Sequence, residues 1–202
     1  MTAQLTGEDA ADATPLVDED LDGLIPTFVA TRAELNLVEQ VNIEAAMLWA
    51  FGRRRVVDAS RLLTIDFADR AHRRMFGDVW RWAGKRRTRI TNIGIDPHEI
   101  VTQMKLLFDD VRYWHDHDIF PPSERAVRLH HRLVSVHPYR NGNGRHARFM
   151  ADLYCQVSRE PRLLWGAAQN IEVDTVVRRQ YIAALQAADR GDIEPLLAFA
   201  QR

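Results

Sequence analysis

Apolar residues recur at helical spacing through most of the chain from residue 31 onward. In residues 31–52 they fall on one face of a helix. The stretch TRAE at the start is a capping box, in which the Thr31 side chain accepts from the Glu34 N–H, and Gly52 ends the segment. Glu39 lies inside the apolar stripe, so we expect its carboxylate to be buried with a partner.

The same periodicity predicts further helices and leaves one segment with a different period. The helices are expected near residues 64–75, 97–114, 122–136, 144–157, 174–188 and 193–201. In residues 85–96, β-branched residues alternate instead around a Thr91-Asn92 turn, which is typical of a β-hairpin. The pattern therefore predicts an all-α fold with one short hairpin.

Composition indicates a globular protein with one domain. The chain has 202 residues, of which 46% are hydrophobic, and this is enough for a sizeable core. A single cysteine, Cys155, excludes an intramolecular disulfide framework. The N-terminus lacks the basic flank and apolar stretch of a secretory signal, and no apolar run approaches the roughly 20 residues that span a bilayer. We therefore expect a cytoplasmic protein with no membrane role.

Charge is unevenly distributed along the chain. The net charge is −1, but residues 1–26 carry seven acidic side chains and no Lys or Arg, which leaves the remainder at +6. Such a leader is typical of a solvated, flexible tail, and a segment that folds over a basic cleft is the alternative. We expect a tail at residues 1–26 and one domain at residues 27–202.

The stretch HPYRNGNGRHAR, residues 137–148, brings a histidine next to a glycine-rich turn. Pro138 has no backbone N–H and disfavours helix at the residue before it, so the preceding helix should end near His137. Gly142 and Gly144 allow positive φ and close backbone approach. Their amides lead into the next helix, and unpaired N–H groups at a helix N-terminus bind anions, most often phosphate.

Two arginines complete this candidate phosphate site. Arg145 lies in the first turn of the expected helix, and Arg148 follows three residues later on the same face. Guanidinium groups pair well with phosphate oxygens. A histidine beside such a cradle favours phosphoryl or nucleotidyl transfer, with His137 removing the proton from an attacking hydroxyl.

The whole stretch resembles the signature of the Fic/Doc family, usually written HPFx(D/E)GNGRxxR. The resemblance continues in WRWAGKRRTRITNIG, which is similar to the family's entry into a flap hairpin, and in YIAALQAADRGDIEPLLAF, which is similar to its C-terminal helices. It covers most of residues 31–199. The stretch ELNLVEQVNI is most similar to the subgroup called mobile mystery protein B, which is often encoded beside a helix-turn-helix partner protein.

The resemblance implies a Fic-fold helical bundle and a protein adenylyltransferase, which transfers AMP from ATP to a Ser, Thr or Tyr hydroxyl of a target protein. His137 would be the general base. The residues that bind phosphate would be Gly142, Asn143, Gly144, Arg145 and Arg148. Arg145 would hold the β-phosphate and Arg148 the γ-phosphate.

Target docking and base binding are also implied by this resemblance. The flap hairpin at residues 85–96 would dock the target backbone by β-augmentation. Its docking residues would be Thr88, Ile90, Thr91, Asn92 and Ile93. Tyr181 is a candidate for contact with adenine, and a packing role is the alternative. Tyr139, in place of the usual Phe, should be an apolar anchor under the loop whose hydroxyl needs a partner.

Metal binding and inhibition depend on two residues that match the family less well. Asn141 stands where the family most often has an acidic Mg²⁺ ligand, and an amide oxygen supplies one coordination bond without the charge. We expect Mg²⁺ as the cofactor, weakly held at Asn141. Glu39, on the first helix, is the candidate for the family's inhibitory glutamate, which pairs with the second motif arginine, here Arg148. The residues around Glu39 match the inhibitory pattern poorly, and pairing with a structural arginine is the alternative.

Two other functions stay open on the sequence alone. A toxin-like module of the toxin–antitoxin kind would bind nucleotide with little turnover, and a Doc-type phosphotransferase would transfer the γ-phosphate. A zinc site at His130 and His137 lacks supporting ligand spacing. The basic clusters at residues 53–55, 73–74 and 85–89 are typical of solvated faces, so we do not expect nucleic acid as a partner.

Overall fold

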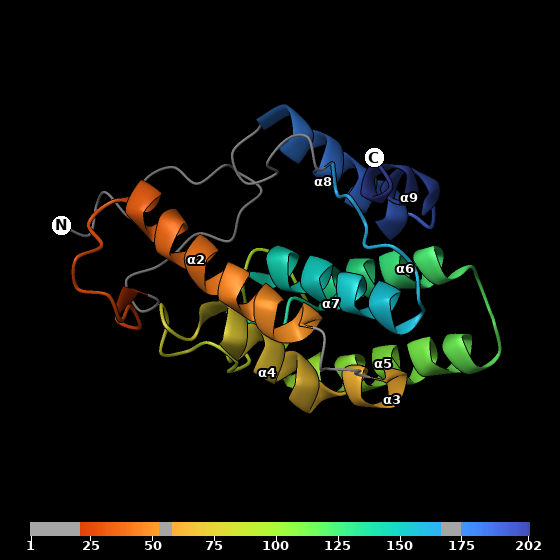
Figure 1. The fold of residues 1–202 in the computed structure, drawn as a ribbon, viewed down its shortest axis with the longest axis horizontal. Coiled ribbons are helices and arrows are strands. Elements are labelled where there is room, and N and C mark those ends of the chain that lie inside the picture. The colour runs from red at the N-terminus through yellow and green to blue at the C-terminus, as the bar shows by residue number, and fades with distance from the viewer. Residues whose placement is uncertain (1–20, 53–57, 167–174) are drawn as a thin grey trace.

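Residues 21–52, 58–166 and 175–202 are described by the computed structural model, and helices joined by loops account for most of them (Figure 1). In chain order the helices are α2 Arg32–Phe51, α3 Ala59–Leu62, α4 Ile65–Phe76, the 3₁₀ turn η2 Pro97–Glu99, α5 Ile100–Asp116, α6 Pro122–Val136, α7 Asn143–Val157, α8 Thr175–Asp189 and α9 Glu194–Ala200. Every predicted helix is present. Helix α3 was not predicted, because four residues are too few to show a period. The first twenty positions of the predicted acidic tail lie outside the described residues.

The helix starts follow the capping chemistry of the sequence. Thr31 caps α2 in a complete capping box, and the Thr64 side chain accepts from the Phe67 N–H at 3.2 Å to cap α4. Asp96 accepts from the His98 N–H at the start of η2. No helix among the described residues is long and apolar enough to cross a membrane.

Helix α7 lies at the centre of the fold. It packs mainly against α6 and also contacts α2, α3 and α4, while α5 packs against α6 and α8 packs with α9 (Figure 1). Its buried residues fall on all sides of the helix, as expected for a helix enclosed by others. The packing therefore fixes the N-terminus of α7, where the glycine-rich loop enters.

The predicted β-hairpin at residues 85–96 is wrong. This segment holds no strand, and the described residues contain only the isolated bridges Leu24↔Trp80 and Arg86↔Tyr139. The Arg87 guanidinium explains the difference, because it donates to the carbonyls of Arg89 and Ile95. The two arms of the segment are thus held by one side chain between them, where a hairpin would have a ladder of backbone bonds.

Candidate active site

His137 is the residue at which α6 ends. Its N–H still bonds to the Leu133 carbonyl at 3.1 Å, but its φ of 52° and ψ of 61° are left-handed. Pro138 disfavours right-handed helical backbone at the preceding residue, which explains why α6 ends here. The turn directs the chain into the glycine-rich loop, and His137 remains only 7% exposed.

The environment of His137 keeps its imidazole neutral. Burial and, to a smaller extent, the nearby positive charge of Arg87 lower the pKa of His137 from 6.5 to about 4. At neutral pH the ring is therefore uncharged and able to accept a proton.

Asn143 closes the loop through its side chain. Its Oδ1 accepts from the Tyr139 N–H at 2.9 Å, and its Nδ2 donates to the Tyr139 carbonyl at 2.8 Å. Both polar atoms of the Asn143 side chain are therefore bonded within the loop. The backbone N–H of Asn143, at the first position of α7, is among the N–H groups that have no acceptor within the helix.

Gly142 and Gly144 are required for different reasons. Gly142 has a φ of 75°, and a Cβ there would lie 2.6 Å from Cζ of Phe76. Gly144 is helical, and its nearest neighbours to an added Cβ would be Arg148 Nη1 and the Tyr181 hydroxyl, both at 3.8 Å. Glycine is thus required at position 142 by the packing of the loop. Glycine at position 144 leaves space at the N-terminal end of α7, where a phosphate would approach.

Alanine at these two positions is expected to give opposite results. Gly142→Ala should lower the free energy of unfolding by about 2 kcal/mol or more, because of strained φ and overlap with Phe76. Gly144→Ala should leave stability within about 1 kcal/mol of wild type yet weaken ATP binding about tenfold, because the methyl group enters the phosphate space. Chemical denaturation and ATP titration calorimetry measure both. Unchanged ATP affinity in a folded Gly144→Ala protein would argue against this phosphate site.

Buried aromatic rings pack against the glycine-rich loop. Tyr139 is fully buried and stacks on His72, with ring centroids 3.8 Å apart, and its hydroxyl donates to Asp69 Oδ1 at 3.0 Å. This confirms the expectation of an apolar anchor with a partnered hydroxyl. His72 donates from Nε2 to the Asn141 carbonyl and accepts from the Gly84 N–H at Nδ1, both at 3.0 Å. Burial keeps the pKa of His72 well below 6.5, which preserves the neutral ring that both bonds require.

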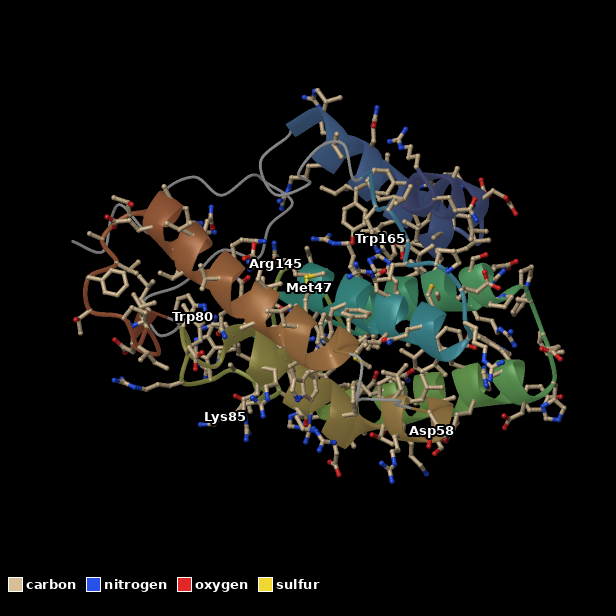
Figure 2. All side chains as sticks on the ribbon, viewed as in Figure 1. Met47, Asp58, Trp80, Lys85, Arg145 and Trp165 are labelled. Carbon is tan, nitrogen blue, oxygen red and sulfur yellow. The ribbon has the colours of Figure 1, made fainter. Side chains whose placement is uncertain are left out.

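Arg145 projects from the first turn of α7 toward α2 (Figure 2). Its guanidinium lies over the Phe76 ring, 4.9 Å from the centroid, and pairs with Glu39 at 2.7 Å between Nη1 and Oε2. Glu39 is 5% exposed and also accepts from Trp80 Nε1 at 2.6 Å. The expected burial of Glu39 with a partner is confirmed.

The partner of Glu39 is Arg145 and not the expected Arg148. Stacking on Phe76 brings Arg145 toward α2, whereas the Arg148 guanidinium lies 5.6 Å from the Tyr181 ring centroid on α8. Tyr181 is 7% exposed, and its hydroxyl bonds to His130 Nε2 at 2.9 Å. Tyr181 therefore packs beneath Arg148, and its contact with adenine stays a prediction.

Asn141 has its side chain turned toward its own loop. Its Oδ1 accepts from the Gly142 N–H at 2.6 Å. Among the residues that the structure describes, no group of three or more His, Cys, Asp or Glu gathers to hold a metal ion.

The predicted docking residues form an extended surface segment beside His137. Thr88, Ile90 and Asn92 are exposed, Ile90 at 79%, and Thr91 and Ile93 are half-buried. The Thr91 hydroxyl donates to the Ile93 carbonyl at 2.6 Å. The segment thus presents alternate side chains to solvent without forming a strand.

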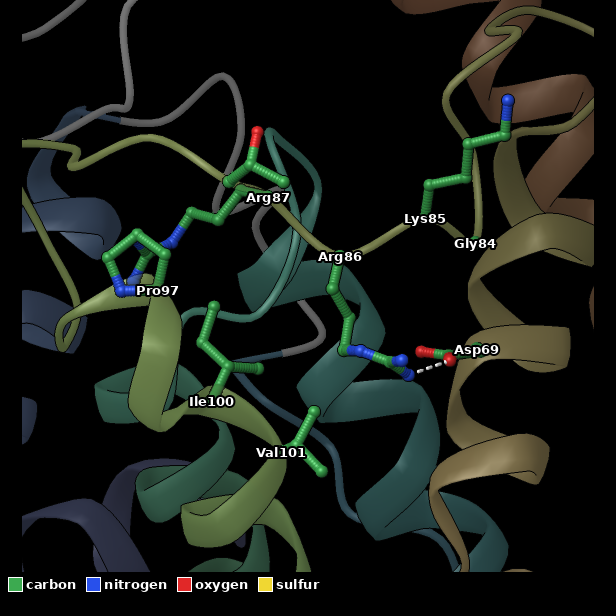
Figure 3. A pocket seen from close by; sticks show the side chains of 9 residues that line it. Asp69, Gly84, Lys85, Arg86, Arg87, Pro97, Ile100 and Val101 are labelled. Atoms are coloured by element: carbon green, nitrogen blue, oxygen red, sulfur yellow. Dashed lines mark hydrogen bonds and ion pairs between the residues drawn. The ribbon is translucent and has the colours of Figure 1, made fainter.

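A cavity of about 430 Å³ opens beside the start of this segment (Figure 3). Its lining comes from residues 84–88, from Pro97, Ile100 and Val101 near the start of α5, and from Asp69 on α4. The Arg86 guanidinium crosses one side of it and forms an ion pair with Asp69 (Figure 3). The residues of the glycine-rich loop do not line this cavity.

Several functional positions were missed from the sequence. His72 could have been found, because it lies on the apolar face of α4 with Ala68 and Ala71. Arg87 was interpreted as part of a solvated cluster, which is wrong, since it is 2% exposed. No local pattern distinguishes it from the neighbouring Lys85 and Arg86.

Comparisons with known proteins agree with this geometry. Residues 62–155 match the model of the Fic/DOC family. Protein adenylyltransferase fic-1 of Caenorhabditis elegans is 32% identical over 144 residues, which cover 68% of this chain and 26% of that protein. Protein adenylyltransferase Fic of Nematostella vectensis is 29% identical over 153 residues, which cover 73% of this chain and 34% of that protein. The chain thus spans about a quarter to a third of the length of these curated relatives.

The fold agrees as well. A solved structure of Fic-1 from C. elegans superposes with a TM-score of 0.67 and 25% identity, covering 91% of this chain and 52% of that one. The matched range contains α4 to α6 and most of α7, including His137 and the glycine-rich loop. Residues 62–155 of this chain therefore form a domain of the Fic/DOC family.

Proposed function

We propose that this chain is a protein adenylyltransferase, which transfers AMP from ATP to a hydroxyl of a target protein. The observation that carries the proposal is the neutral, buried imidazole of His137 next to an N-terminus of α7 kept open by Gly144. The adenylyltransferase relatives support the same reaction.

In this reaction His137 removes the proton from the target hydroxyl, whose oxygen attacks the α-phosphorus of ATP. A P–O bond to the target forms as the bond to pyrophosphate breaks, and the proton stays on the imidazole until solvent takes it. The N–H groups at the start of α7 stabilise the charge on the phosphate oxygens. Arg145 and Arg148 hold the β- and γ-phosphates, which fixes the leaving group in line.

Glu39 opposes this arrangement, because it already neutralises Arg145. A carboxylate beside the site also repels the β-phosphate. We propose that the pair with Glu39 lowers activity until Arg145 is released.

Magnesium fits this site only if the phosphates of the nucleotide supply most of its ligands. The loop offers one uncharged side-chain oxygen, Asn141 Oδ1, which accepts from the Gly142 N–H. Asn141 would therefore contribute one ligand, and the phosphate oxygens most of the others. Bound Mg²⁺ would neutralise phosphate charge.

Asn141→Asp is expected to lower the Mg²⁺ concentration for half-maximal labelling by about tenfold, because a carboxylate adds charge to the ligand. Asn36→Asp adds the same charge on an exposed position of α2 and is the matched control. Both are titrated with Mg²⁺ at saturating ATP. Superimposable titrations of wild type and Asn141→Asp would exclude Asn141 as a ligand.

The target protein is proposed to pair with the segment from Thr88 to Ile93. Ile90 is 79% exposed and can anchor an apolar residue of the target. Pairing with the target's backbone depends little on the target's side chains, so the segment can position a hydroxyl in targets of different sequence. The cavity beside residues 84–88 has room for a neighbouring side chain of the target.

The experiment that tests the function is incubation of the full chain and a lysate with [α-³²P]ATP or [γ-³²P]ATP, for wild type and His137→Ala. Adenylyl transfer labels protein from the α position only and requires His137. Label from the γ position identifies a phosphotransferase. Binding of ATP without protein label identifies a nucleotide-binding module, for which a helix-turn-helix partner and a role in a toxin–antitoxin pair stay predictions.

A further inference from the structure

Arg87 is a buried arginine whose contacts converge on the active site. It is 2% exposed, and its Nε donates to the His137 carbonyl at 2.7 Å. Nη2 also lies 3.4 Å from the Val136 carbonyl, and the Arg87 N–H donates to the Pro138 carbonyl at 2.9 Å. One residue therefore contacts three consecutive carbonyls, at the point where α6 ends and the loop begins.

The same guanidinium also holds the docking segment. Nη1 donates to the Arg89 carbonyl at 2.8 Å, and Nη2 donates to the Ile95 carbonyl. Arg89 and Ile95 lie on either side of residues 90–94. Because the guanidinium is planar and rigid, it fixes both arms of the segment relative to His137.

Gly94 brings the segment into direct contact with the base. Its φ is 107°, and an added Cβ would lie 2.6 Å from the His137 Cβ and 2.7 Å from Arg87 Nη2. The backbone at Gly94 thus packs against both residues, and only glycine fits there. The segment, the guanidinium and the base form one rigid unit.

We propose that Arg87 is a positioning residue for the reaction, which holds His137 in its left-handed conformation and sets the distance between the base and a hydroxyl docked on residues 88–93. The proposal rests on the proposed function, because it assigns His137 as the base. A displacement of about 1 Å between reacting groups can lower a rate about a hundredfold. The effect of Arg87 should therefore appear in the rate of transfer and not in ATP binding.

Arg87 also acts on the charge of the base. Its guanidinium lowers the pKa of His137, and Asp96 is the carboxylate that acts on Arg87 in turn. Loss of the positive charge should raise the pKa of His137 above about 4, while burial, the larger cause, still keeps it below 6.5. Lysine retains the charge but cannot reach carbonyls of both arms and of His137 together.

The test compares Arg87→Met and Arg87→Lys with a matched control, Arg125→Lys. Arg125 is also a buried arginine, 4% exposed, and donates from Nη1 to the carbonyls of Trp114 and His115. It lies twelve residues before His137 on α6, about 18 Å away along the helix axis. Its replacement disturbs packing to a similar degree without touching the site.

Two measurements are made on the folded fraction of each protein. The first is the maximal rate and the half-saturating ATP concentration for self-labelling from [α-³²P]ATP. The second is the titration of His137 by NMR of protein labelled with ¹³C-histidine, assigned with His137→Ala.

Arg87→Met is expected to lower the maximal rate at least about a hundredfold, and Arg87→Lys about tenfold, with half-saturating ATP changed less than about threefold. The pKa of His137 should rise in Arg87→Met and stay low in Arg87→Lys. Arg125→Lys should change neither quantity. A rate and a His137 titration in Arg87→Met equal to those of Arg125→Lys would overturn the proposal.

The NMR titration separates this proposal from the proposed function. If no protein is labelled even in wild type, adenylyl transfer fails as the function. The NMR spectra of His137 then decide whether Arg87 positions this residue. A His137 ring chemical shift that changes in both Arg87 variants, with a raised pKa in Arg87→Met only and neither change in Arg125→Lys, supports it in that case, and unchanged spectra refute it.

Discussion

Replacement of His137 by alanine is expected to lower the rate of AMP transfer by roughly 10²- to 10⁴-fold, the usual contribution of a general base. The imidazole is buried at the end of α6 and neutral at neutral pH, so it can take the hydroxyl proton. ATP binding should change little, because the phosphates are bound by α7. Label transfer from [α-³²P]ATP and calorimetry with ATP measure the two effects.

His117→Ala is the control for this substitution. His117 is exposed at the C-terminal end of α5, and its ring bonds only to the Tyr113 carbonyl of its own helix among the bonds described for it. Its removal should leave the rate unchanged. A His137→Ala protein that labels targets as fast as His117→Ala would show that His137 is not the base.

The pH dependence of kcat/KM should reflect the same burial. A base works only when it is unprotonated, so the rate rises with pH through the pKa of His137 and is flat above it. Because burial and Arg87 lower this pKa from 6.5 to about 4, we expect no loss of rate from His137 between pH 8 and about 5.5. A fall in kcat/KM centred near pH 6.5, in protein that is still folded at that pH, would contradict a desolvated imidazole at His137.

Substitution of Glu39 is expected to raise the rate of labelling by about 10- to 100-fold. A hydrogen bond between charged groups contributes roughly 1.5–3 kcal/mol, and Arg145 gains this interaction with phosphate once Glu39 no longer occupies it. Glu39→Gln removes the charge but keeps an acceptor for Trp80, whereas Glu39→Gly removes both. Both variants should have a lower free energy of unfolding, because they break a buried pair.

Glu44→Gly is the matched control for the glycine variant. Glu44 lies on the exposed face of α2 and accepts from Gln40, so its replacement weakens the helix equally without touching Arg145. Self-labelling and labelling of lysate proteins are compared at equal folded concentration. If Glu39→Gly is destabilised but labels no faster than Glu44→Gly, the pair is a structural contact and not an inhibitory one.

Local chemistry explains which elements could be predicted from the sequence. Thr31 and Thr64 cap helices through bonds to residues three positions away, and Pro138 acts on its immediate neighbour. Such effects depend on a few consecutive residues. The glycine-rich loop was therefore predicted in its correct place, between a helix ending at His137 and one beginning near Gly144.

The failures involve side-chain contacts that no local pattern of residues reveals. Glu39 and Arg145 are 106 positions apart, and the choice of Arg145 over Arg148 is made by the stacking of Arg145 on Phe76. The predicted hairpin failed because a side chain, Arg87, holds the carbonyls of its two arms. Alternation of β-branched residues indicates an extended chain, but it does not reveal what that chain bonds to.

Phe76, the last residue of α4, links two properties that could otherwise change independently. Its ring leaves room only for glycine at position 142, and the same ring supports the Arg145 guanidinium that Glu39 holds. Substitution of Phe76 is therefore expected to alter the shape of the glycine-rich loop and the strength of the Glu39–Arg145 pair together.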